Sequence, residues 1–147
     1  MTDSNNVKYE LDNITKHQDE PTIITIDMTK REVATELRKL RNRQPESARQ
    51  GHAYIIWNDA EWLTKKGVTT AVPIPALPPT YSGNTHALLE AYKMSVLLYN
   101  DHTDAMVAAE TMIFRAFPIS HFLELMDDEN EVVGYTPREL IQHLEDT

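Results

Sequence analysis

The residues of this chain that could do chemistry are its six histidines and the carboxylates near them. His121 and Glu124 are one helical turn apart, as are Glu139 and His143, so each pair would place a nitrogen and an oxygen on one helix face. No two histidines have that spacing, and the HExxH pattern of zinc proteases is absent. A small metal-dependent enzyme would need these four side chains to converge in a cleft. We expect ordinary surface or core roles for them and no metal site.

Motifs for nucleophilic catalysis and phosphate binding are missing as well. The chain has no cysteine, which excludes disulfides, thiol nucleophiles and thiolate zinc sites and is typical of a cytosolic protein. No serine lies in a nucleophile-elbow context, and four glycines are too few for a phosphate-cradling loop. The acidic segment 127–131 lacks the glycine and the terminal glutamate of a calcium loop. We therefore predict no enzyme activity, no cofactor and no small-molecule substrate.

Length and composition fit one ordinary globular domain. The chain has 147 residues, of which 41% are hydrophobic and 25% charged. No apolar run approaches the ~18 residues that span a bilayer, and the N-terminus lacks the basic and apolar regions of a secretory signal. We expect a cytoplasmic protein without a membrane partner. The net charge of −9 argues against an extended nucleic-acid-coating surface.

The basic residues are unevenly distributed. Six of the fourteen lie between positions 30 and 43, and this basic strip comprises Lys30, Arg31, Arg38, Lys39, Arg41 and Arg43. One interpretation is a solvated helix face with acidic partners at helical spacing. The other is a binding strip for RNA or for an acidic neighbour, and here we expect only weak, salt-sensitive RNA association.

Helix patterns dominate the chain. Capping-box spacings at Thr29–Glu32, Asn58–Glu61 and Thr136–Glu139 predict three helix starts, and Pro137 suits the first position of the last helix. After a cap at Thr85 or Asn84, a long helix is predicted with Leu88, Tyr92, Ser95 and Tyr99 facing inward. We expect a break or bend at 100–103, then a second helix carrying Met106, Ala109, Ile113 and Phe117 and ending at Pro118. A short helix over 119–126 and an acidic turn should follow.

The remaining segments predict an aromatic core, an extended arm and a tail. Trp57 and Trp62 are expected in the core. Four prolines (Pro73, Pro75, Pro78 and Pro79) remove amide donors and predict an extended arm. Alternating β-branched residues allow a small hairpin from 22–26, 53–57 or 131–135. Residues 1–20 are too poor in apolar side chains to order themselves, so we expect a flexible tail before a domain over 21–147. The predicted fold is mainly α, a compact bundle of about five to six helices.

The order of these segments resembles the N-terminal, capsid-like part of Gag from copia-type LTR retrotransposons. The likeness covers about residues 30–147 and rests on a leucine-spaced helix, a "GH" followed by aliphatic residues, a proline-rich arm, a long helical region and a final "LIQHLEDT". The corresponding pieces include "VATELRKLRNR", "ARQGHAYIIWNDAEWL", "TAVPIPALPP" and "HALLEAYKMSVLLYNDHTDAMVAAETMI". That family carries a downstream zinc knuckle, which a chain without cysteine cannot form.

The resemblance implies a structural protein that self-associates in the manner of a capsid. A stiff proline arm fits this expectation, because it loses little entropy when it docks on a neighbour. A simple connection between two helical layers is the alternative role for the arm. Two other functions remain open: a monomeric adaptor that binds a peptide in an apolar groove, and the small metal-dependent enzyme considered above.

Overall fold

The fold is built from helices and turns. The computed structural model describes residues 11–40, 52–57, 61, 75–79, 83–129, 131–132 and 134–146. Its elements, in chain order, are the 3-10 helix η1 (Leu11–Asn13), α1 (Ile23–Leu37), the 3-10 helix η3 (Ala53–Ile55), α3 (His86–Ala116), the 3-10 helix η4 (Ile119–Leu125) and α4 (Pro137–Asp146). None of the described residues forms a strand. The mainly α class is therefore confirmed, with slightly fewer helices than the five to six expected.

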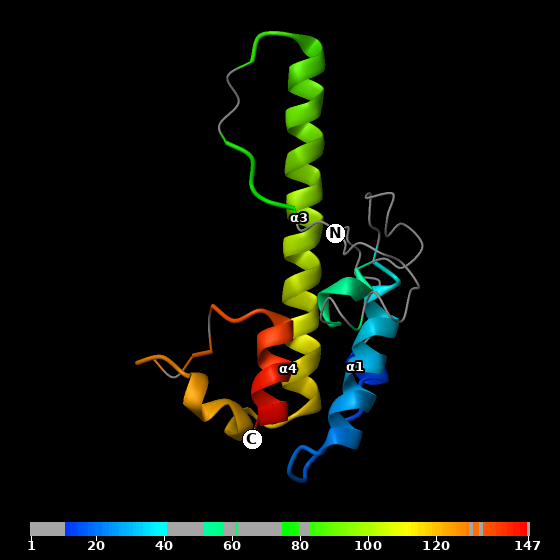
Figure 1. Ribbon diagram of the computed structural model, residues 1–147, viewed down its shortest axis with the longest axis vertical. Helices are drawn as coiled ribbons and strands as arrows, with labels where there is room; N and C mark the ends of the chain where they lie inside the picture. Colours follow the sequence, from blue (N-terminus) through cyan, green and yellow to red (C-terminus); the bar gives the residue numbers. More distant parts are fainter. Residues whose placement is uncertain are drawn as a thin grey trace.

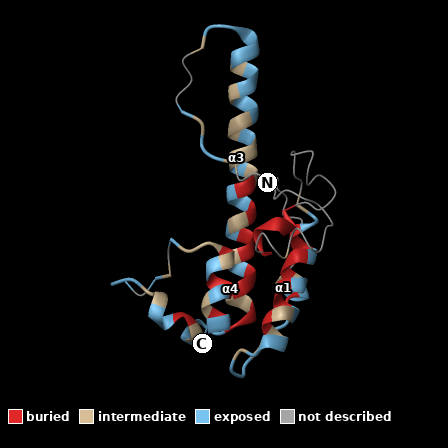
Figure 2. Cartoon of the chain, viewed as in Figure 1, coloured by how far each residue is buried: buried red, intermediate tan, exposed pale blue. Residues whose placement is uncertain are grey.

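The long helix α3 is the axis of the molecule. Its first turn is capped by Thr85, whose Oγ1 accepts a hydrogen bond from the Leu88 amide at 3.2 Å. Residues 102–116 of α3 pack with α1, η3 and α4, and together these form a unit that we call the body. Residues 86–101 project beyond the body (Figure 1), and the burial pattern changes from buried to exposed along the same helix (Figure 2).

The core of the body joins apolar side chains from all of its elements. The largest fully buried hydrophobic residues are Tyr54, Phe117, Phe122, Leu37, Ile56, Met112, Ile113, Leu140, Leu144 and Val33. Several alanines of α3, among them Ala105 and Ala109, are also fully buried and allow close helix packing. Trp57 belongs to this core, as predicted, whereas Trp62 lies outside the described residues.

The start of α1 differs from the prediction. The helix begins at Ile23, so 22–26 is not a strand, and Thr29 is buried in mid-helix instead of capping it. Thr22 is the cap: its hydroxyl accepts from the Thr25 amide at 3.1 Å, and the Thr25 hydroxyl accepts from the Thr22 amide at 2.9 Å. This reciprocal pair satisfies two donors of the first turn, which outweighs the β-propensity of the isoleucines.

Segment 53–57 is also not a strand. All six residues from His52 to Trp57 are buried, but the Ile55 and Ile56 amides donate to carbonyls three residues earlier. The His52 amide donates to the Leu37 carbonyl at 2.9 Å, which ties this turn to the end of α1. Local 3-10 hydrogen bonds therefore replace the expected ladder, and the apolar run fills the core as a compact turn.

The predicted break in the long helix is absent. α3 runs through residues 100–103 without interruption, because its backbone hydrogen bonds continue and no proline or glycine occurs in it. Of the four residues expected to face inward, Leu88 is 52% exposed, and the other three are half-buried: Tyr92, Ser95 and Tyr99. No residue of α3 before His102 is fully buried. The second predicted apolar set is better placed, since Ala109, Ile113 and Phe117 are buried.

The last helix and the acidic turn match the sequence patterns. The Thr136 amide donates to Glu139 at 2.8 Å, and the Glu139 amide donates to the Thr136 hydroxyl at 3.2 Å, which is the predicted capping box. Before it, Gly134 adopts a φ of 83°, a conformation that glycine tolerates without strain. In the acidic turn, Asp127 accepts from the amides of Glu129 and Glu131.

Residues 11–20, expected to belong to a flexible tail, lie against the body. Ile14 is buried in the core, and the His17 amide donates to the Ala116 carbonyl at 2.8 Å. The His17 ring stacks on Phe117, and Asp12 pairs with Arg115. A single well-placed isoleucine and a few hydrogen bonds order a segment whose composition is otherwise polar.

Candidate functional site

One apolar stripe runs along the whole of α3 at spacings of three or four residues, which keeps its members on one face. Its lower members are buried in the body: His102, Ala105, Ala109, Met112 and Ala116. Its upper members, which we call the upper stripe, are Ala87, Ala91, Met94 and Leu98. The face that holds the body together thus continues beyond the body.

Three of the four residues of the upper stripe are exposed to solvent. Ala87 and Ala91 are exposed, Met94 is 48% exposed, and Leu98 is half-buried. Leu97, beside the stripe, is 42% exposed. Glu90 and Lys93 are the only charged residues from position 87 to 100. A helical segment with so few charges is typical of a buried or interface helix, and its exposed apolar face makes it a candidate interaction site.

Residues 75–79 of the arm lie beside the projecting half of α3 (Figure 1). They are neither helix nor strand, as the prolines require. Pro75 and Pro78 are half-buried, whereas Leu77 is 64% exposed and Pro79 is exposed. Pro73 lies outside the described residues. The predicted extended arm is present in the part that is described.

The basic strip is not a continuous surface. Lys30 is buried, with its Nζ 2.6 Å from Glu61 and 5.3 Å from the centre of the Trp57 ring. Arg31 is exposed and pairs with Asp27 at 2.7 Å. Neither interpretation, a solvated helix face or a binding strip, holds for Lys30. Its aliphatic part is buried in the core and its amine is paired.

The rest of the basic strip is partly neutralised. Lys39 pairs with the buried carboxylate of Glu36 at 3.0 Å. Arg38 is exposed at the end of α1. Arg41 and Arg43 lie outside the described residues. Three of the six cations of the basic strip, Lys30, Arg31 and Lys39, thus already have carboxylate partners within the chain.

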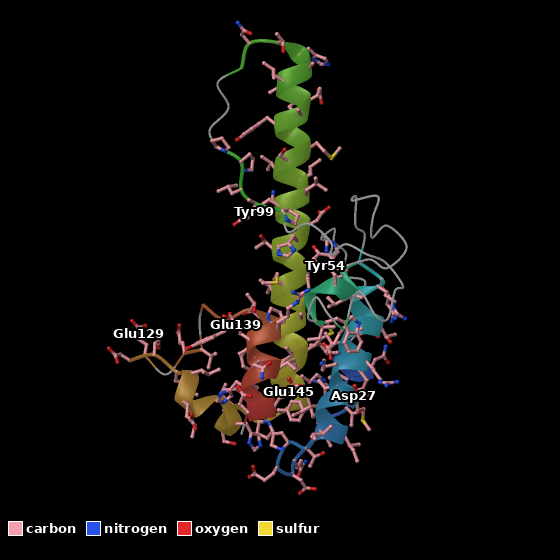
Figure 3. The ribbon with its side chains drawn as sticks, viewed as in Figure 1. Asp27, Tyr54, Tyr99, Glu129, Glu139 and Glu145 are labelled. Carbon is pink, nitrogen blue, oxygen red and sulfur yellow. The ribbon has the colours of Figure 1, made fainter. Side chains whose placement is uncertain are left out.

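A groove surrounds Lys30 between α1 and α4. One side of it has a volume of about 400 Å³ and is lined by Ile23, Ile24, Asp27, Lys30, Glu61 and Glu145. The other side, of about 210 Å³, reaches Arg138 and Gln142 on α4. Figure 3 shows Asp27 on α1 and Glu145 on α4, the two helices that bound it. The Lys30 amine in this groove is already paired with Glu61.

A buried polar cluster lies where the body ends on α3. The Tyr54 hydroxyl is 2.7 Å from His102 Nδ1 and 3.4 Å from His52 Nδ1. Arg138 donates to the Tyr54 carbonyl at 2.7 Å. Figure 3 shows Tyr54 beside α3. The cluster connects η3, α3 and α4 through groups that are hydrogen-bonded although they are buried.

Burial controls the protonation of this cluster. It lowers the pKa of His102, and nearby His52 and Arg138 lower that pKa further by charge repulsion. Burial also raises the pKa of Tyr54 well above its usual range, against a smaller opposing effect of Arg138. His102 is thus neutral near pH 7 and can accept a hydrogen bond from the protonated Tyr54 hydroxyl. Elsewhere on α3, burial raises the pKa of Glu110.

Three of the four residues considered for metal binding have partners elsewhere in the chain: His121, Glu139 and His143. His143 Nε2 donates to the His121 carbonyl at 2.9 Å, and Glu139 caps α4. His121 lies 4.0 Å from Glu20, and Glu124 is exposed. Within the part of the chain that the structure describes, no group of three histidines or carboxylates could hold a metal ion. In the same part, no helix is both long and apolar enough to cross a bilayer.

Comparison with known proteins identifies no relative. No protein-family model, curated protein or solved structure matches this chain.

Two features escaped the sequence patterns. Each residue of the stripe predicted to face inward, beginning with Leu88, is one position after a residue of the upper stripe. The prediction assumed that every apolar helix face is buried, so the exposed upper stripe was not predicted. The low charge of residues 87–100 is the signal that could have indicated an interface. The polar cluster joins His52 and Tyr54 to His102, 48 residues further on, so only the fold could bring it together.

Proposed function

We propose that this chain is a structural, non-catalytic helical protein that associates with copies of itself, in the manner of a capsid-like module. The observation that carries the proposal is the upper stripe, which extends the core-facing surface of α3 into solvent. Covering exposed apolar area of this kind with another protein lowers the free energy by about 25 cal/mol per Å² of area buried. Among the described residues, α1, η3 and α4 do not extend over the projecting half of α3 (Figure 2).

The contact should be weak when it is made once. Residues 86–101 extend only about 24 Å at 1.5 Å per residue, so a helix pair of this length gives a small interface of the kind found in transient complexes. Together with a contact through a second surface, a small contact of this kind suits a protein that tiles into larger species. Such a protein is monomeric or dimeric when dilute and forms larger species at high concentration.

The resemblance to copia-type Gag supplies the biological setting of this proposal. A capsid-like segment of a retrotransposon, or a domesticated derivative of one, would act in the cytoplasm and would need no cofactor or substrate. RNA association would be weak, because the net charge is −9 and Lys30 and Lys39 have internal carboxylate partners.

A charge placed on the upper stripe tests the proposal. Met94→Asp should shift the association to at least tenfold higher protein concentration in sedimentation velocity, because a carboxylate in an apolar interface loses its hydration. Thr103→Asp is the matched control: it adds the same charge at an exposed position of the same helix, off the stripe. Circular dichroism should show both variants folded.

Two results would count against this function. Wild-type protein that stays strictly monomeric at millimolar concentration would favour the monomeric adaptor, with the Lys30 groove as the place to look for a peptide. Equal effects of the two variants would mean that association uses another surface.

A further inference from the structure

We infer that the upper stripe pairs with the upper stripe of a second copy in antiparallel orientation, with Ala87 opposite Leu98 and Ala91 opposite Met94. The inference rests on the proposed self-association and specifies its partner surface, its orientation and its register.

The stripe is complementary to itself in this register. Its first two members are small (Ala87 and Ala91), and its last two are large (Met94 and Leu98). Turning one copy end to end about the midpoint between positions 92 and 93 sets each large side chain against an alanine of the other copy. Alternation of small and large residues across two helices lets them approach closely and fill the space between them.

The position of the body excludes the parallel arrangement. α1, η3 and α4 cover the same face of α3 that the upper stripe continues, but at residues 102–116. Two copies aligned in parallel on this face would have both bodies at the same level, in the space between the two helices (Figure 1). In the antiparallel arrangement the bodies lie at opposite ends.

The length of the projecting half fits the antiparallel register. With Ala87 opposite Leu98, Asp101 of one copy lies level with Asn84 of the other. Asp101 directly precedes His102, the first residue of α3 that is buried in the body. The tip of each α3 therefore ends where the body of the second copy begins, and all of residues 86–101 are used in the contact.

The net charge also favours the upper stripe as the meeting place. A chain of charge −9 repels its own copies over most of its surface, so association is easiest where neither copy presents charge. The upper stripe contains no ionisable side chain. The contact is isologous, because the same residues serve both copies, and it closes as a dimer. Larger assemblies would require a second surface.

Disulfide trapping tests the orientation, and the absence of native cysteine makes its background clean. Two single variants of the full chain, Ala87→Cys and Leu98→Cys, are purified reduced, mixed and oxidised mildly at a concentration at which wild type associates. A disulfide needs Cα atoms about 4.4–6.8 Å apart. Ala87 and Leu98 of opposing copies would meet this condition, whereas two copies of the same variant would hold their thiols about 16 Å apart along the axis. We expect disulfides between unlike chains.

The controls separate the two proposals. If Leu98→Cys folds poorly, a mixture of Ala91→Cys and Met94→Cys checks the register instead. Both of these positions are exposed, so the substitutions should not disturb the fold. Thr103→Cys, off the stripe, should cross-link more than tenfold more slowly. Homodisulfides of Ala87→Cys and of Leu98→Cys in an associating sample would overturn the antiparallel orientation and leave self-association standing. A wild-type sample that shows no association in sedimentation velocity would instead overturn the proposed function, and this inference with it.

Discussion

Burial of His102 makes the stability of the fold depend on pH, because it lowers the pKa of this side chain in the folded state. The groups around it come from three elements: His52 and Tyr54 at η3, Asp101 on its own helix and Arg138 on α4. Burial is the largest cause of its lowered pKa, and His52 and Arg138 act in the same direction. Neutral His102 keeps its hydrogen bond with Tyr54, whereas the protonated ring would carry a buried charge beside Arg138.

The free energy of unfolding should therefore fall in acid. Above the ordinary histidine value of 6.5, His102 is neutral in both states and the full stability is present. As the pH drops below 6.5, the unfolded state binds the proton first, so stability declines by at most about 1.4 kcal/mol per pH unit from this group until the folded pKa is reached. Urea unfolding at pH 7.5 and 5.5 should show a larger loss for wild type than for His102→Gln. Equal losses would mean that other groups cause the acid sensitivity.

Lys30 and Arg31 are adjacent cations with opposite roles. Lys30 is buried beneath Glu61 and against Trp57, and Arg31 is exposed with Asp27 as its partner. Removing a buried charge leaves its carboxylate partner without compensation, whereas an exposed pair contributes little.

Substitution of each by methionine should separate these roles. Lys30→Met should lower the free energy of unfolding by about 2 kcal/mol, and Arg31→Met, which removes the same charge from the next position, by less than about 0.5 kcal/mol. Urea denaturation curves of both variants provide the measurement. Similar small effects would show that Lys30 is available to external partners after all, as part of the basic strip.

At the scale of elements, the N-terminal segment is the clearest departure from the sequence. Its composition predicts disorder, yet Ile14 enters the core between α1 and the end of α3. Ile14→Ala should therefore lower the free energy of unfolding by about 2–4 kcal/mol, as for other buried isoleucines. Ile24→Ala, the same substitution at a side chain 76% exposed on α1, should change it by less than about 0.5 kcal/mol. If the two variants have equal stability, the segment is not docked.

The sequence predicted elements best where local interactions decide them. The capping box at Thr136, the cap at Thr85 and the end of α3 near Pro118 were all correct, because each depends on residues within one turn. It failed where capping or distant contacts outweigh strand propensity. The isoleucines before Thr25 are exposed in the first turn of a helix that the Thr22–Thr25 pair caps. The apolar run before Trp57 is buried as a 3-10 turn tied to the end of α1.

The candidate site was only partly predictable for the same reason. The apolar spacing along α3 is visible in the sequence, but which half of the helix the body covers depends on where α1 and α4 dock. The basic strip was assembled from adjacent positions, whereas the fold sends Lys30 inward and Arg31 outward on one helix.

For the whole molecule, the response of association to salt distinguishes two kinds of contact. If the basic strip of one copy met the acidic turn at 127–131 of another, salt would weaken the contact by screening attraction. If the upper stripes meet, the dominant electrostatic effect is repulsion between two chains of charge −9, and salt relieves it.

We expect association to strengthen with salt. Raising the ionic strength from about 0.01 M to about 0.1 M shortens the screening length from about 30 Å to about 10 Å, which is less than the separation of the two bodies in the antiparallel pair. The dissociation constant from sedimentation equilibrium should fall by about threefold to tenfold, while Met94→Asp should remain dissociated throughout. Charge reversal at Arg38 and Lys39 should leave the wild-type salt response in place, since neither lies on the upper stripe. The opposite result is association that weakens with salt and is abolished by this charge reversal. It would mean that the interface lies at the end of α1 and not on α3.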